Sequence, residues 1–164
     1  MTPKEQEDLD HRLIDAAWNG RTETVKALLA HGANAYADND YALCLTAWNS
    51  HTETVEVLLA NGADVHARND LALRWAAFNG HTETVQALAR RIFAPDSWRG
   101  KKRTEIEAYA TALYTKIESH NPQSEHLRQA GSILVDCALT CWEQVRPAPP
   151  RLTISLLPAQ PRPW

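Results

Sequence analysis

Cysteine and histidine are the side chains of this 164-residue chain best suited to metal or acid–base chemistry, and their spacing gives them little opportunity for it. Cys137 and Cys141 stand one helical turn apart, which could supply half of a zinc site, but no matching Cys or His pair follows at a suitable spacing. We therefore expect helix packing at these thiols and no metal. The chain contains no Gly-x4-Gly-Lys phosphate loop, no His-Glu-x-x-His and no Gly-x-Ser-x-Gly. The sequence thus predicts no catalytic residue, no enzyme activity and no cofactor.

A second set of residues could contact an anion. Trp98 lies within a basic run that would suit phosphate contacts combined with base stacking. The run comprises Arg90, Arg91, Arg99, Lys101, Lys102 and Arg103. A solvated link between two parts of the protein would look the same. Residues 1–89 carry 6 Lys and Arg against 13 Asp and Glu, giving −7, whereas residues 90–164 carry 11 against 7, giving +4.

The acidic half would repel phosphate, so nucleic-acid binding is the less favoured alternative. If it occurs, we expect the contacts from Arg99, Lys101, Lys102 and Arg103. An acidic protein could use the same cluster.

Three 30-residue units follow one another between Leu13 and Arg90. The clearest copies are Gly20-Arg-Thr-Glu-Thr-Val25, Ser50-His-Thr-Glu-Thr-Val55 and Gly80-His-Thr-Glu-Thr-Val85. A fixed period of this length indicates identical helix-turn-helix units stacked side by side. Small or aliphatic residues recur in register, as core columns require: Leu13/Leu43/Leu73, Ala17/Ala47/Ala77, Val25/Val55/Val85 and Leu28/Leu58/Leu88. The sequence predicts an all-α solenoid, with Gly20 and Gly80 in the left-handed position that ends a first helix.

These units resemble the ankyrin repeat family, whose signature reads roughly T-P-L-H-x-A-A-x-x-G-H-x-E-V-V-x-L-L-L-x-x-G-A-D-V-N-A. Two stretches carry the match, Leu73-Arg-Trp-Ala-Ala-Phe-Asn-Gly-His-Thr-Glu-Thr-Val85 and Val57-Leu-Leu-Ala-Asn-Gly-Ala-Asp-Val-His-Ala67. The usual repeat has about 33 residues, so residues are missing between Ala67 and Leu73. The projecting β-hairpin finger should therefore be trimmed to a short turn. The resemblance implies that His51 and His81 form hydrogen bonds with the backbone of neighbouring units.

The resemblance also implies a function. Ankyrin repeats bind proteins without a chemical step, so we expect a stoichiometric inhibitor or adaptor with a protein partner. The shortened units are similar to ankyrin repeats of large DNA viruses, phages and bacteria. That similarity favours an inhibitor that blocks a host defence protein.

An aromatic residue recurs near the end of each first helix. Trp18, Trp48 and Phe78 occupy positions that face the concave groove of ankyrin repeats and are usually polar there. Trp is enriched in interaction hot spots, so we expect these rings, together with Trp75, to anchor the partner. Three further residues are expected to orient it through polar contacts: Asp15, Arg74 and Asn49. The alternative is that the rings fill space left by the missing fingers or pack under the C-terminal segment.

Other segments flank the units. We divide the chain into an N-terminal cap at 1–12, three repeats at 13–94, a basic link at 95–103, a helical C-terminal cap at 104–146 and a proline-rich tail at 147–164. Thr104-Glu-Ile-Glu107 has the form of a capping box, and Asn121-Pro122 separates two cap helices. Their apolar faces comprise Ile106, Ala110, Leu113 and Ile117, then Leu127, Ala130, Leu134, Ala138, Cys141 and Val145. The tail is either a disordered end or an extended strand.

The N-terminal sequence and the hydropathy pattern bear on the cellular compartment of the protein. The chain does not open with a secretory signal, and no apolar stretch approaches the roughly 20 residues that span a bilayer. Three irregularly spaced cysteines fit reduced thiols. We expect a cytoplasmic protein, in the host-cell cytoplasm if it is viral or phage, and no membrane partner. Monomer and homodimer both fit, because the tail could pair across a two-fold axis.

Overall fold

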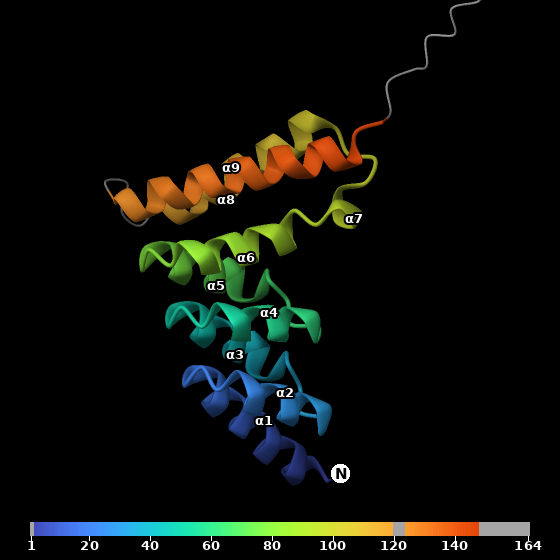
Figure 1. Ribbon diagram of the computed structural model, residues 1–164, viewed down its shortest axis with the longest axis vertical. Coiled ribbons are helices and arrows are strands. Elements are labelled where there is room, and N and C mark those ends of the chain that lie inside the picture. The colour runs from blue at the N-terminus through green and yellow to red at the C-terminus, as the bar shows by residue number, and fades with distance from the viewer. Residues whose placement is uncertain (1, 120–123, 148–164) are drawn as a thin grey trace, which may run out of the picture.

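The computed structural model describes residues 2–119 and 124–147, and the regular structure in these ranges is helical. Helices α1 to α6 stack as three antiparallel pairs, and α8 and α9 lie across the end of the stack (Figure 1). The bounds are α1 (Pro3–Trp18), α2 (Thr22–Ala30), α3 (Ala37–Trp48), α4 (Thr52–Ala60), α5 (Ala67–Phe78), α6 (Thr82–Ile92), α7 (Pro95–Trp98), α8 (Arg103–Glu118) and α9 (Glu125–Val145). The predicted all-α solenoid is confirmed. Within the described ranges, no helix is long and apolar enough to cross a membrane.

Four columns of apolar side chains run through the stack and form its core. The columns headed by Leu13, Ala17, Val25 and Leu28 are buried in all three units, with no member more than 6% exposed. Burying one Leu or Val side chain contributes about 2 kcal/mol. Each helix pair is too thin to bury this face alone, so the neighbouring pair supplies the other side. The register predicted from the 30-residue period is confirmed.

A glycine follows the first helix of the first unit and of the third unit, and each glycine lies close to a histidine of the next element in the stack. Gly20 and Gly80 have φ of 65° and 75°, as predicted. A Cβ on Gly20 would lie 2.5 Å from the ring of His51, and a Cβ on Gly80 would lie 2.9 Å from the ring of His126 in α9. The C-terminal helices therefore offer the third unit a contact like the one that the second unit offers the first.

Left-handed turns stand where ankyrin fingers would project. Residues 38–40 have φ of 48°, 53° and 59°, and residues 68–70 have φ of 51°, 62° and 58°. Asn and Asp enter this region more readily than other non-glycine residues. The Arg68 guanidinium donates to the Asp38 carbonyl at 2.7 Å and lies 5.0 Å from the centre of the Tyr41 ring, which ties successive turns together. The predicted short turn is confirmed.

The start of α8 differs from the prediction. The backbone N–H of Lys102, the N-cap residue, donates to the Glu105 carboxylate at 2.7 Å. The predicted capping box at Thr104 and Glu107 is wrong, because the helix begins two residues earlier than that box requires and Glu105 is the residue that can reach back to the cap. Glu107 instead accepts a hydrogen bond from Arg103 at 2.7 Å.

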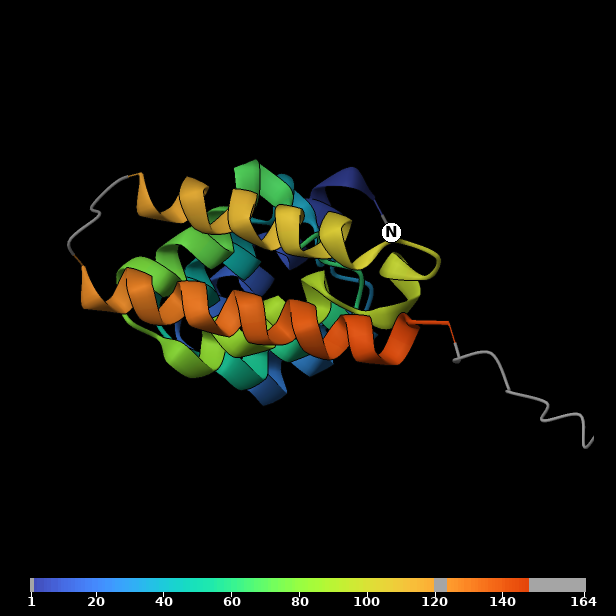
Figure 2. The ribbon, with the colours of Figure 1, turned by 90° about the horizontal axis from the view of Figure 1, so that it is seen from above.

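Helices α8 and α9 lie side by side over the last repeat (Figure 2). The four predicted inner positions of α8 are buried, as are the first five predicted for α9, while Val145 is half-buried. The apolar faces predicted from helical periodicity are thus confirmed for these helices. The predicted boundary at Asn121-Pro122 and the tail from residue 148 onward lie outside the described residues.

Candidate functional site

The aromatic column, defined here as Trp18, Trp48 and Phe78, is open to solvent. These side chains end α1, α3 and α5 and are 45%, 38% and 51% exposed. Trp75 is half-buried and packs against Trp48 in a T-shaped pair, with ring centroids 5.2 Å apart. Among the described residues, the C-terminal helices therefore leave each of these rings at least 38% exposed.

Hydrogen bonds from the following unit hold the backbone beneath the column. Asn49 Nδ2 donates to the Trp18 carbonyl at 3.1 Å, and His51 Nε2 lies 3.1 Å from the same oxygen. His81 Nε2 lies 2.8 Å from the Trp48 carbonyl in the same way. The predicted role of His51 and His81 between units is confirmed. Asn49 directs its amide N–H to the scaffold, and its contact with a partner stays a prediction.

An apolar notch of about 210 Å³ opens at the C-terminal end of the column. It is lined by Trp48, Arg74, Trp75, Phe78 and Ile117. Four of the predicted site residues therefore meet in one place, together with Ile117 of α8, which was not among them. Asp15 lies apart on α1, where it is exposed and accepts a hydrogen bond from Asn19 Nδ2 at 3.3 Å.

Aspartates tie the inner helices of the first two units to the loops that close those units. Asp10 Oδ1 accepts from the backbone N–H of Asn34 at 2.7 Å, and Asp40 Oδ1 accepts from that of Asp64 at 2.8 Å. Burial raises the pKa of Asp40, and the bond from Asp64 opposes that shift. Sequence reasoning missed these aspartates, although they recur every 30 residues.

Asp70 occupies the same position in the third unit but has different partners. In the third unit, Ile92 and α7 stand where the first two units have their closing loop. The Asp70 carboxylate instead binds His66 Nδ1 at 2.7 Å and the ammonium group of Lys116 in α8. The Asp70 side chain is 6% exposed and that of Lys116 is 38% exposed. The cap thus supplies a cation where the repeats supply a backbone N–H.

A family model of three ankyrin repeats matches residues 13–96. The chain belongs to the ankyrin repeat family. Repeats of this family are protein–protein interaction modules and are generally non-catalytic scaffolds. No curated protein matches the chain. The ankyrin scaffold accounts for His51 and His81, the core columns and the turns.

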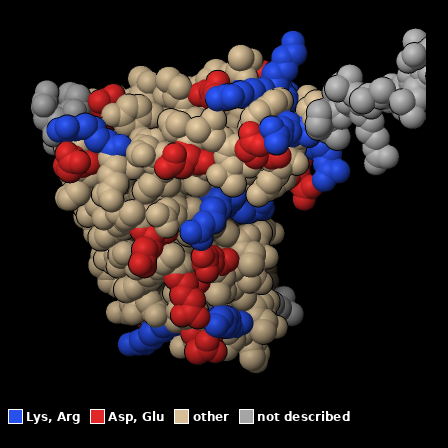
Figure 3. Space-filling model, turned by 45° about the horizontal axis from the view of Figure 1, so that its top comes forward, with Lys and Arg blue, Asp and Glu red and all other residues tan. Residues whose placement is uncertain are grey.

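The basic link after the ankyrin repeats is partly engaged by the scaffold. Trp98 stacks on Phe93 with ring centroids 5.9 Å apart, and its Nε1 donates to the Ile92 carbonyl at 2.9 Å. Arg99 pairs with Asp96 at 2.9 Å. On the face shown in Figure 3, acidic side chains lie among the basic ones. Trp98 is therefore committed to packing and is not a free platform for a base, and anion contact by the link stays a prediction.

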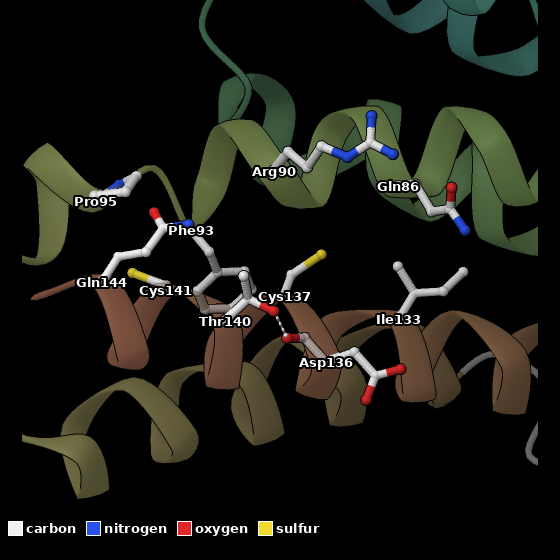
Figure 4. A pocket seen from close by; sticks show the side chains of 10 residues that line it. All are labelled: Gln86, Arg90, Phe93, Pro95, Ile133, Asp136, Cys137, Thr140, Cys141 and Gln144. Atoms are coloured by element: carbon white, nitrogen blue, oxygen red, sulfur yellow. Dashed lines mark hydrogen bonds between the residues drawn. The ribbon is translucent and has the colours of Figure 1, made fainter.

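A second hollow, of about 460 Å³, lies between the last ankyrin helix α6 and α9 (Figure 4). Its lining includes Phe93, Arg90, Ile133, Asp136, Cys137 and Cys141. Burial raises the pKa of both thiols, so they are protonated near neutral pH. Cys141 is buried in the core, as predicted. Among the described residues, no group of three or more Cys, His, Asp or Glu side chains could hold a metal ion.

Proposed function

We propose that this ankyrin protein is a stoichiometric binder that holds a protein partner through its concave face. The observation that carries the proposal is the aromatic column, in which three large rings recur every 30 residues and stay 38% to 51% exposed. Large exposed apolar side chains gathered on one face mark interaction sites in soluble proteins more often than scattered ones do. Aromatic residues are enriched in such sites, because their rings bury a large area at a small cost in rotamer freedom.

The scaffold beneath the column supports the same proposal. The carbonyls of Trp18 and Trp48 are held by side chains of the following unit. The Trp48 ring is braced by Trp75. A surface that is already ordered loses less conformational entropy when it binds. The column is therefore suited to a partner that meets it as a preformed surface.

We further propose that the binder works as an inhibitor or an adaptor, and that it blocks a host defence protein in the cytoplasm. The short turns at residues 38–40 and 68–70 support the role of inhibitor or adaptor. Without projecting fingers, the protein must bind through its helix faces and act by covering a surface of the partner. The second part is an analogy with the shortened ankyrin repeats of viruses, phages and bacteria. Identification of the captured protein tests it directly.

The experiment compares three tagged forms of the protein in affinity capture followed by mass spectrometry. The wild type and Tyr36→Ala should retain the same partner, because Tyr36 is 60% exposed but lies in a loop away from the column. The double variant Trp18→Ala, Trp48→Ala should lose the partner while its melting temperature is largely kept. Retention of the partner would reject the binding role, and collapse of the fold would assign the rings to packing.

A further inference from the structure

We infer that the proline-rich tail turns back along α9 and seats its apolar run, Leu152-Thr-Ile-Ser-Leu-Leu157, in the hollow between α6 and α9. The lining of this hollow, drawn in Figure 4, shares no residue with the aromatic column. The contact would therefore form with or without the proposed binding function.

The lining of the hollow combines apolar and polar side chains. Phe93 is buried, whereas Ile133 and Cys137 are only half-buried. Among the described residues, part of this apolar surface thus stays in contact with water, and covering it would be favourable. The polar members of the lining are Gln86, Arg90, Asp136, Thr140 and Gln144.

The described chain ends beside the hollow. Gln144 belongs to the lining, α9 ends at Val145, and residue 147 is the last one described. From Gln144 the lining runs back along α9 to Ile133, a distance of about 16 Å in an α-helix. Residues 148–151 can span up to about 13 Å, which is enough for the chain to turn back before the apolar run begins.

The apolar run has the pattern of an extended strand, with prolines on both sides. Alternate side chains of a strand share one face, so Leu152, Ile154 and Leu156 would lie together and Thr153 and Ser155 would lie opposite. The three apolar positions span about 13 Å in a strand. That span fits within the length of α9 that lines the hollow.

The volume of the hollow fits three side chains of this size. An apolar cavity of about 150 Å³ is enough to bind benzene, and the hollow offers about 460 Å³. The backbone of a covered strand also needs hydrogen-bond partners. The amide groups of Gln86 and Gln144 in the lining can both donate and accept such bonds.

The test measures how fast iodoacetamide modifies Cys137, which lines the hollow, in three full-length chains. Two variants add the same two charges to the tail. Ile154→Asp, Leu156→Asp places them on the face that should enter the hollow, and Thr153→Asp, Ser155→Asp places them on the opposite face. Both variants change only residues outside the described ranges, so the melting temperature should match that of the wild type.

In the wild type, Cys137 should react only while the tail is away from the hollow. Ile154→Asp, Leu156→Asp should raise the rate about tenfold, because a carboxylate is costly to bury among apolar groups. Thr153→Asp, Ser155→Asp should stay within about twofold of the wild type, because its charges remain in water. Cys44 is buried in the repeats and should react equally slowly in all three chains. Peptide mass spectrometry distinguishes the thiols.

Equal Cys137 rates in the three chains would overturn the inference, as would an equal rise in both variants. Protection of Cys137 that increases with protein concentration would assign the hollow to a second copy of the chain and would overturn it as well. Partner capture by the aromatic column is measured separately, so failure of the proposed function would leave these rates unchanged.

Discussion

Lys116 should hold the C-terminal cap on the last ankyrin repeat by neutralising Asp70. Replacing it with Met keeps most of the side chain's apolar stem but leaves the Asp70 carboxylate, which is 6% exposed, with His66 alone. Removing one partner of a fully buried ion pair costs about 3–5 kcal/mol, and an exposed pair contributes about 0–1 kcal/mol. Because the Lys116 side chain is 38% exposed, we expect an intermediate loss of about 2 kcal/mol.

This loss should lower the melting temperature by about 6 °C in a calorimetric scan. Hydrogen exchange should show the loss first in α8, because a repeat protein is stabilised by contacts between neighbouring units. Lys101→Met is the matched control, since Lys101 is exposed in the link and the ion pair with Asp70 is made by Lys116. The double variant Asp70→Asn, Lys116→Met should recover part of the loss, because no buried charge is then left unpaired.

Equal melting temperatures for Lys116→Met and Lys101→Met would refute this account of the cap. So would a double variant whose loss is the sum of the two single losses, because independent sites add in that way and coupled sites do not.

Further expectations concern the turns and the thiols. Gly20→Ala should lower the free energy of unfolding in urea by about 2–3 kcal/mol, because its Cβ would lie 2.5 Å from the His51 ring. Gly62→Ala, at φ 95° with no atom within 4 Å of the added Cβ, should lower it by about 1 kcal/mol. Equal losses would show that the His51 contact does not matter. At about pH 8, iodoacetamide should modify the half-exposed Cys137 first, because burial raises the pKa of Cys44 to about 11 and shields its sulfur until the protein unfolds. Peptide mass spectrometry of the native protein would contradict this if Cys44 were alkylated as fast as Cys137.

The 30-residue period made much of the fold predictable from sequence, although the aspartates that recur at positions 10, 40 and 70 were missed. Leu13, Leu43 and Leu73 share one environment, so their repetition identifies a core column without knowledge of the tertiary structure. His51 and Gly20 are predictable for the same reason, because His81 repeats the bond of His51 to the preceding unit and Gly80 repeats the positive φ of Gly20. Periodicity also placed the inner faces of α8 and α9.

Contacts that do not repeat from unit to unit were not predicted from the sequence. The pairing of Asp70 with Lys116 joins residues 46 positions apart, and no local pattern marks it. The start of α8 was misplaced because Thr104 has a typical capping side chain, whereas the structure uses the backbone N–H of Lys102, which any residue could supply. The left-handed turn at residues 38–40 accepts hydrogen bonds from Arg68 of the following unit, a contact that local sequence does not reveal, so the sequence predicted a short turn but not its conformation.

The candidate site was predictable only in part. The repetition of Trp18, Trp48 and Phe78 fits a binding column and equally fits a gap filled in the same way in each unit. The rings are 38% to 51% exposed, which supports the proposed binding column. The inclusion of Ile117 in the notch depends on where α8 packs, which sequence periodicity does not determine.

The central claim is that the aromatic column binds a protein, and the affinity of the purified partner tests it most directly. Truncating a hot-spot residue costs about 2 kcal/mol or more, and about 1.4 kcal/mol is a factor of ten in affinity. The account therefore predicts that Trp18→Ala, Trp48→Ala weakens binding at least about 100-fold at a nearly unchanged melting temperature, while Tyr36→Ala changes it by less than about threefold. An affinity of the double variant within about threefold of wild type would contradict the account.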